Sequence, residues 1–509
     1  MDLSAYRAQA EAFVAELGDA YHRHYAGLDE GFEVERIYAR HAQLFTRAAV
    51  ERLGEASAAA SDAARAGSGG GDDAARRLRL LRDFAVEGLL GRATAAQAER
   101  LARQEAALRL DVGGTVLGFR ASAVAQANEP DGERRAAIEA ARLEATATTL
   151  NPLHREALRR TRELTAELGW ESYRALCAEL KGLDLGGLAQ QAERFLAATD
   201  DAFADVLAPA VERTVGVPLP RLARADLPWF FRAREQDGAF PAARLLDAYE
   251  RTLAGLGLEA TAGGRVLLDV EPRPGKSPRA FCVAVRAPED VRLVVAPVGG
   301  RDDYVALLHE GGHAQHFAHV ERSLAFEYRH LGDNAVTEAF AFLFDRLAEE
   351  PEWLRRRLGV EDADGSLAAH ARAARLVSLR RYCAKLSYEL VAHGEAPPGD
   401  ALLAGVYARE LSRALAIAWP TETFLADVDE GFYVAAYLRA WALESRLRRW
   451  LRDRFGAAWF EVPEAGAALR ELWREGQRLS AEELLASLTG ERLDFAALAD
   501  DLGSVAPSA

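Results

Sequence analysis

Apolar residues recur every three or four positions along most of this sequence, which is the spacing that places side chains on one face of an α-helix. The pattern is clear near the N-terminus, in Phe13 and Leu17. It continues over residues 1–66 and 74–127, and it returns from residue 133 to about 213. The chain is therefore predicted to be mainly α-helical.

Glycine-rich and polar stretches interrupt this helical pattern. Residues 65–73 (RAGSGGGDD) are predicted to form a surface loop, because no strand precedes them and no Lys-Ser/Thr pair follows as in a phosphate-binding loop. Helices are expected again over 367–394 and from 400 to about 490. Residues 493–509 are predicted to be a short helix with a frayed end.

One part of the chain has a different pattern. Residues 265–270, 280–285 and 291–296 are short runs rich in β-branched residues, separated by turns that contain Pro and Gly. They predict a small β-sheet, and an amphipathic helix over 302–320 follows it directly. The predicted fold class is a mainly α, two-lobed protein with a deep cleft and a small sheet next to that helix.

Length and turn composition predict two regions. A chain of 509 residues is too long for one simple core. The stretch GVPLP at residues 216–220 is a candidate hinge. We therefore expect an N-terminal helical region, 1–215, and a second region, 216–509.

Charge and cysteine content exclude several classes of protein. The formal net charge of −15 argues against a nucleic-acid-binding surface. Cys177, Cys282 and Cys383 are scattered and odd in number, which fits reduced thiols in a cytoplasmic protein. The N-terminus lacks the apolar core of a signal peptide, and no segment approaches the roughly 20 apolar residues of a membrane span. We expect a cytoplasmic protein that binds neither nucleic acid nor membrane.

The candidate chemistry lies in the helix predicted over 302–320, which contains the motif H-E-x-x-H. His309 and His313 are four residues apart on a helix, so both imidazoles can reach one ion. Glu310 points partly sideways, where it can hold a water molecule on that ion. The alternative without a metal is a pair of ordinary, hydrogen-bonded helix histidines. The motif predicts a zinc site with Glu310 as general base.

A catalytic zinc ion usually has three protein ligands and one open position, so a third ligand is expected downstream. A second apolar helix is predicted over 334–349, with Asp333 or Asn334 as its N-cap. Glu338 is the single acid in its apolar run, and a buried carboxylate needs a partner or a metal. Glu338 is the predicted third ligand.

Two adjacent glycines, Gly311 and Gly312, lie inside the predicted zinc helix. Each costs about 1 kcal/mol of helix stability relative to alanine. Close approach of another element or of substrate would explain them. His316 and His319 are expected to orient neighbours or to face solvent rather than to bind metal.

The motif HEGGHAQH, followed by Glu338 twenty-five residues after His313, resembles the thimet oligopeptidase and oligoendopeptidase F family of zinc peptidases. The upstream segment RPGKSPRAFC, ending at Cys282, is similar to the strand that precedes the zinc helix in that family. The resemblance is clear over about 265–345 and looser towards the C-terminus. It implies a gluzincin-type metallopeptidase whose catalytic region is 216–509, with one Zn²⁺ per chain and short peptides as substrates.

The resemblance also implies residues that stabilise the oxyanion. The family has a Tyr-x-x-x-Tyr segment in the corresponding C-terminal region, which matches Tyr433 and Tyr437 here. This sequence departs from the family in two places: no His lies in DVDEGF before Tyr433, and Ala440 stands where a further Tyr is expected.

Three alternative functions stay open at the level of sequence. A related zinc carboxypeptidase or dipeptidyl carboxypeptidase would use the same ligands. A zinc hydrolase of another class has no supporting motif. A catalytically silent helical peptide-binding protein would keep the metal for structure, although Glu310 argues against it because a structural site needs no water-activating carboxylate.

Overall fold

The computed structural model describes residues 2–29, 31, 33–66 and 71–503. These residues form two compact units, and each unit is assembled from separated parts of the chain. Residues 67–70 of the predicted loop and 504–509 of the predicted tail lie outside the described residues. Within the described part, α3 ends at Arg65 and α4 begins at Gly71.

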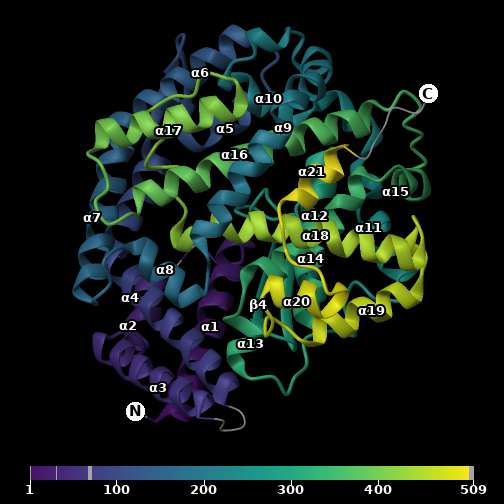
Figure 1. The fold of residues 1–509 in the computed structure, drawn as a ribbon. Coiled ribbons are helices and arrows are strands. Elements are labelled where there is room, and N and C mark those ends of the chain that lie inside the picture. The colour runs from purple at the N-terminus through teal and green to yellow at the C-terminus, as the bar shows by residue number, and fades with distance from the viewer. Residues whose placement is uncertain (1, 30, 32, 67–70, 504–509) are drawn as a thin grey trace. The chain divides into compact units, whose positions relative to one another are not determined.

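The first unit comprises residues 1–92, 238–361 and 439–493. It contains α1 (Leu3–Tyr25), α2 (Val34–Arg40), α3 (Arg47–Arg65), the start of α4 (Gly71–Ala107), α11 (Leu245–Gly255), β3 (Val266–Asp269), β4 (Phe281–Arg286), β5 (Asp290–Val294), α12 (Arg301–Ala318), α13 (Phe326–His330), α14 (Asn334–Asp345), α15 (Pro351–Trp353), most of α18 (Tyr433–Phe455), α19 (Pro463–Arg474) and α20 (Ala481–Thr489) (Figure 1).

The second unit comprises residues 93–237, 362–438 and 494–509. It contains the rest of α4, β1 (Arg109–Val112), β2 (Thr115–Gly118), α5 (Phe119–Ala127), α6 (Gly132–Ala145), α7 (Asn151–Glu167), α8 (Tyr173–Lys181), α9 (Leu185–Val215), α10 (Leu227–Arg232), α16 (Ser366–Ala392), α17 (Asp400–Leu415), the first residues of α18, and α21 (Ala496–Gly503).

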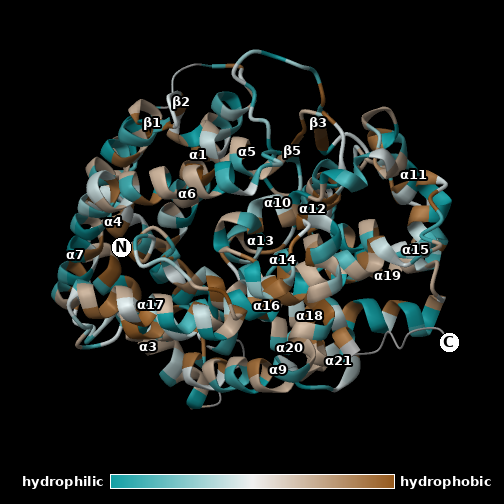
Figure 2. Cartoon of the chain, turned by 90° about the horizontal axis from the view of Figure 1, so that it is seen from above, coloured by the Kyte–Doolittle hydropathy of each residue, from teal (hydrophilic) through white to brown (hydrophobic). Residues whose placement is uncertain are grey.

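The predicted fold class is confirmed as mainly α with a small sheet next to the helix of the motif. Many single helices carry both hydrophobic and hydrophilic residues along their length (Figure 2), as the helical spacing of apolar residues requires. None of the helices in the described part of the chain is both long enough and apolar enough to cross a bilayer.

The small sheet in the first unit has the strand order β3–β5–β4. β3 is parallel to β5, with Val266 opposite Val291, and β4 is antiparallel to β5, with Cys282 opposite Leu293. The three strands lie within the three predicted β-rich runs, give or take one residue. β4 is therefore an edge strand, and it contacts both α1 and α12.

The prediction of helices over 74–127 is wrong for residues 109–118. α4 ends at Ala107, and β1 and β2 form an antiparallel hairpin before α5 begins. Gly113 and Gly114 form its two-residue turn, and both have positive φ, of 59° and 82°. Such a turn matches the twist of a hairpin, and only glycine adopts these angles readily.

The compact units do not follow the boundary predicted at residues 215 and 216, because the first unit combines the N-terminal helices with the small sheet and the helix of the motif. The two units are defined by contacts within the chain and not by catalytic activity. The division into an N-terminal helical region and a catalytic region therefore stays a prediction.

Candidate metal centre

α12 carries the H-E-x-x-H motif, and α14 packs against it more extensively than any other element does. Glycine makes this packing possible. A Cβ atom on Gly312 would lie 2.8 Å from Cα of Ala341 and 2.8 Å from the carbonyl oxygen of Phe340, both on α14. The main chains of the two helices therefore approach each other more closely than any larger residue would allow.

Gly311 serves the same purpose on another side of α12. Its Cβ position lies 2.4 Å from the ring of Tyr249, a fully buried residue of α11. The prediction that another element approaches the paired glycines closely is thus confirmed, with α11 at Gly311 and α14 at Gly312. The apolar face of α12 is completed by Tyr304, Leu307 and Leu308, which are all buried.

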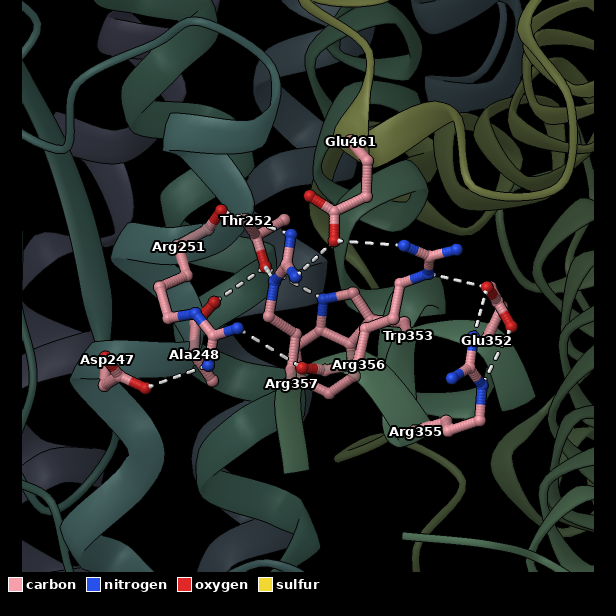
Figure 3. Close-up of polar contacts among 10 residues, drawn as sticks. All are labelled: Asp247, Ala248, Arg251, Thr252, Glu352, Trp353, Arg355, Arg356, Arg357 and Glu461. Carbon is pink, nitrogen blue, oxygen red and sulfur yellow. Dashed lines mark hydrogen bonds and ion pairs between the residues drawn. The ribbon is translucent and has the colours of Figure 1, made fainter. Parts of the chain in front are cut away.

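α11 is itself fixed by a buried arginine (Figure 3). Arg357 donates hydrogen bonds to Oγ1 of Thr252 at 3.2 Å, to the carbonyl oxygen of Arg251 at 3.2 Å and to Oε1 of Glu461 at 2.6 Å. The indole of Trp353 also donates to Oγ1 of Thr252, at 2.9 Å. These contacts join the face of α11 that carries Thr252 to residues 353–357 and to Glu461.

α14 begins at a well-defined N-cap. The Asp333 carboxylate accepts a hydrogen bond from the backbone N–H of Ala335 at 3.0 Å, which confirms one of the two predicted caps. Arg439 donates to both oxygens of the same carboxylate. Burial opposes ionisation of Asp333, but the charge of Arg439 and these hydrogen bonds lower its pKa below the usual value.

His309, His313 and Glu338 meet between α12 and α14. One nitrogen or oxygen from each of these three residues, here called the ligand trio, lies within 4.8 Å of the other two. Oε2 of Glu338 is 3.4 Å from Nε2 of His309 and 3.6 Å from Nε2 of His313. Two atoms that each lie about 2.1 Å from a tetrahedral zinc ion are about 3.4 Å apart, so these separations suit a shared ion.

The other nitrogen of each imidazole contacts a polar group of α14. Nδ1 of His309 lies 2.9 Å from Oδ2 of Asp345, and Nδ1 of His313 lies 2.8 Å from Oγ1 of Thr337. When Nδ1 of each ring donates its hydrogen to these oxygens, the lone pair of Nε2 points to the centre of the trio. This outer arrangement is typical of metal-binding histidines.

The electrostatic field at the trio favours positive charge. Burial opposes protonation of His309, but hydrogen bonds and charge from Asp345 and Glu338 outweigh it and raise the pKa of His309 to about 10. Burial also opposes ionisation of Glu338, but hydrogen bonds from His309 and His313 lower its pKa well below the usual value. The residues present therefore fit a divalent cation in donor type, in spacing and in charge.

Glu310 lies on α12 next to the trio and is partly buried. Burial raises the pKa of its carboxyl group, although the charges of His313 and His309 act in the opposite direction. The backbone N–H of Cys282 donates a hydrogen bond to this carboxylate, which connects it to the edge strand β4. The pKa of Glu310 is thus shifted in the opposite direction from that of Glu338, although both residues lie close to the same histidines.

Four other residues considered from the sequence are not part of the ligand trio. Tyr433 and Tyr437 form one face of the first turn of α18, with ring centroids 5.1 Å apart, and they belong to the second unit, whereas the trio belongs to the first. His316 is fully buried and bonded to the carbonyl oxygen of Gly476, and His319 is bonded to the carbonyl oxygen of Gln315. Neither histidine belongs to the ligand trio, and the buried His316 does not face solvent.

Sequence reasoning missed Asp345 and Thr337 as partners of the histidines. A signal for Asp345 was present, because it follows Glu338 by seven residues, which is two helical turns, and so shares its face of α14. Thr337 had no such signal. Its contact with His313 depends on how closely the two helices approach.

The sequence matches no known family model, and no curated protein is similar to it in sequence. The fold, however, resembles a solved structure. A crystal structure described as that of a “putative oligoendopeptidase F” from Bacillus anthracis str. Ames matches with a TM-score of 0.63. The match covers 97% of this chain and 88% of the other chain at 13% sequence identity, so it establishes a likeness of fold.

Proposed function

We propose that this protein is a zinc-dependent peptidase that hydrolyses internal peptide bonds of short peptides. The observation that carries the proposal is the ligand trio with its outer partners Asp345 and Thr337, placed beside a carboxylate of raised pKa. The likeness of fold to a protein described as an oligoendopeptidase F and the motif in α12 support the same class of reaction.

The chain supplies separate groups for holding the ion and for moving protons. His309, His313 and Glu338 would hold the zinc ion, which when bound polarises a carbonyl group and acidifies water. Glu310 takes a proton from the attacking water at its carboxylate oxygen and delivers it to the leaving amine. A pKa raised by burial suits this role, since the carboxyl group must keep the proton between the two transfers.

The substrate would bind along β4. This strand is at the edge of its sheet, and the backbone N–H of Cys282 on it reaches Glu310. Main-chain hydrogen bonds to an edge strand hold a peptide in extended form. Tyr433 and Tyr437 are the proposed donors to the oxyanion, and this assignment rests on the family resemblance.

The test is hydrolysis of a mixed set of short quenched peptides by the purified protein. Activity is measured as purified, after a chelator, and after zinc is restored, and the products are identified by mass spectrometry. Internal cleavage that is lost with the chelator and recovered with zinc supports the proposal. Stepwise products from the C-terminus would indicate a carboxypeptidase instead. Absence of cleavage by protein that holds zinc would contradict peptidase function.

A further inference from the structure

A concave site lies in the first unit at the C-terminal end of α12, next to His319. Its volume is about 400 Å³, within the range of about 300–1,000 Å³ that is typical of small-molecule sites. It is bounded by the start of β3, the turn between β4 and β5, the residues that follow α12, and α19. We call it the arginine pocket, after the charged residues that line it: Arg265, Arg322, Arg470, Arg474, Glu321 and Glu471.

The arginine pocket is positively charged on a strongly negative protein. Four arginines and two glutamates give its lining a net charge of +2, whereas the whole chain carries −15. Both glutamates lie against Arg474, with Glu321 at 2.8 Å and Glu471 at 3.8 Å. Arg322 is paired at 2.6 Å with a carboxylate outside the pocket, that of Glu289.

When Glu289 is counted as well, the four arginines and three glutamates carry a net charge of +1, and Arg265 and Arg470 are the two arginines without a carboxylate partner in the described part of the chain. Within the described part of the chain, neither guanidinium has a carboxylate within 4.0 Å. Each is held by a backbone carbonyl instead: Nε of Arg265 donates to Ala262 at 2.8 Å, and a terminal nitrogen of Arg470 donates to Gly257 at 3.1 Å. One bond to the main chain orients each planar group and leaves most of its five N–H donors for another partner.

His319 shows that both charges act at the same place. Burial, together with the charges of Arg265 and Arg470, lowers the pKa of its imidazole to about 4, although the bond to the carbonyl oxygen of Gln315 acts in the opposite direction. The ring therefore stays neutral at physiological pH and packs against Trp473, with centroids 5.5 Å apart. It adds a wall to the pocket without adding charge.

We infer that the arginine pocket binds a small dianion, held by the guanidinium groups of Arg265 and Arg470. Two oriented guanidinium groups match two negative charges, and Arg binds phosphate and carboxylate oxygens in a forked geometry. The ligand is thus a compact molecule that bears a phosphate group or two carboxylates. The pocket uses no residue of the ligand trio, so the inference does not depend on the proposed peptidase function.

Isothermal titration calorimetry of the full chain tests this inference, with inorganic phosphate and succinate as separate probes. The wild type is expected to bind at least one of them, more weakly as salt is raised. The double variant Arg265→Gln/Arg470→Gln is expected to lose about tenfold or more in affinity. Arg52→Gln, at an exposed arginine of α3 outside the pocket, is expected to bind like the wild type.

The two probes distinguish the two kinds of dianionic ligand. Binding of phosphate alone assigns a phosphate-bearing ligand, and binding of succinate alone assigns a dicarboxylate. The single variants Arg265→Lys and Arg470→Lys, which keep the charge but lose the fork, should show an intermediate loss even if the double variant is unstable. Failure of the wild type to bind either anion, or binding that survives removal of both guanidinium groups, would overturn the inference.

Discussion

Two glutamates near the same pair of histidines have pKa values that are shifted in opposite directions. The pKa of Glu338 is lowered because hydrogen bonds from His309 and His313 outweigh the effect of burial, whereas burial dominates at Glu310 and raises its pKa. A carboxylate that stays ionised suits a metal ligand, and one that accepts a proton more readily suits a general base. The two proposed roles follow from these environments rather than from residue type.

The first prediction concerns Glu310→Gln. Glutamine has nearly the same shape but cannot carry the proton, so the catalytic rate should fall by at least about 100-fold. Zinc content should stay that of the wild type, because residue 310 is not in the trio. Peptide hydrolysis and metal analysis on the same preparation check both parts. A variant that keeps its catalytic rate would remove Glu310 from the site.

A buried carboxyl group in the second unit makes stability depend on pH. Burial raises the pKa of Glu389 to about 8, with Lys385 lowering it and Asp429 raising it. Between its unfolded value, about 4.5, and pH 8, the folded state therefore binds the extra proton. Stability contributed by this group is fully present below pH 4.5 and is lost as pH rises towards 8.

The Glu389→Gln variant isolates this effect. Compared with the variant, the wild type should lose about 1.4 kcal/mol of unfolding free energy per pH unit in that window, since one proton is released on unfolding. Urea unfolding of both proteins at several pH values measures the difference. Parallel pH profiles for the two proteins would show that Glu389 is ionised in the folded state.

At the scale of elements, the approach of α12 to α14 decides whether the trio can form. In Gly312→Ala the added Cβ would meet main-chain atoms of Ala341 and Phe340 at 2.8 Å, which cannot move aside as a flexible side chain would. The helices should separate and carry Glu338 away from the histidines. We expect a loss of about 1–3 kcal/mol in stability and weaker zinc binding by calorimetry.

Gly405→Ala on α17 is the matched control. It is also a glycine inside a helix, but among the described residues nothing beyond its chain neighbours and its own helix backbone lies within 4 Å of its Cβ position. Alanine should therefore stabilise that helix by about 1 kcal/mol through its better propensity. If both variants changed stability in the same direction, close packing at Gly312 would not be the cause.

The network around Arg357 predicts that substitutions at two nearby arginines differ in their effect on stability. Arg357→Met breaks a buried set of hydrogen bonds to Thr252, Arg251 and Glu461, and it should cost about 3 kcal/mol (Figure 3). Arg355→Met removes an exposed pair with Glu352 and should cost less than about 1 kcal/mol. Thermal unfolding of the two variants measures which one loses more stability. Equal losses, or a larger loss for Arg355→Met, would show that the network contributes little.

How much could be predicted from sequence differs between elements. The motif helix, the third-ligand helix and the three β-rich runs were predicted because each carries its own local pattern and spacing. The hairpin of β1 and β2 was not predicted, because the apolar residues around Gly113 and Gly114 fall within a stretch, 74–127, where only helices were expected. The contacts of the outer residues Asp345 and Thr337 depend on packing between helices, which no local pattern records.

At the scale of the whole molecule, the likeness of fold extends far beyond the motif. It covers 97% of the chain at only 13% identity. The two chains therefore share a fold although few of their residues are identical. The helical class could be predicted from apolar spacing alone. The length of the chain predicts two regions, but it does not predict which segments make up each compact unit, because each unit joins segments that are far apart in the sequence.

The central claim is that His309, His313 and Glu338 together hold one zinc ion. The most direct measurement is the zinc content and affinity of the chelator-treated, re-metallated full chain, for the wild type, Glu338→Gln and a control outside the trio, Glu352→Gln, whose side chain is partly exposed. We predict one tightly bound zinc per chain for the wild type and the control, and affinity weaker by more than about 100-fold for Glu338→Gln. Unchanged zinc binding by Glu338→Gln would contradict the account.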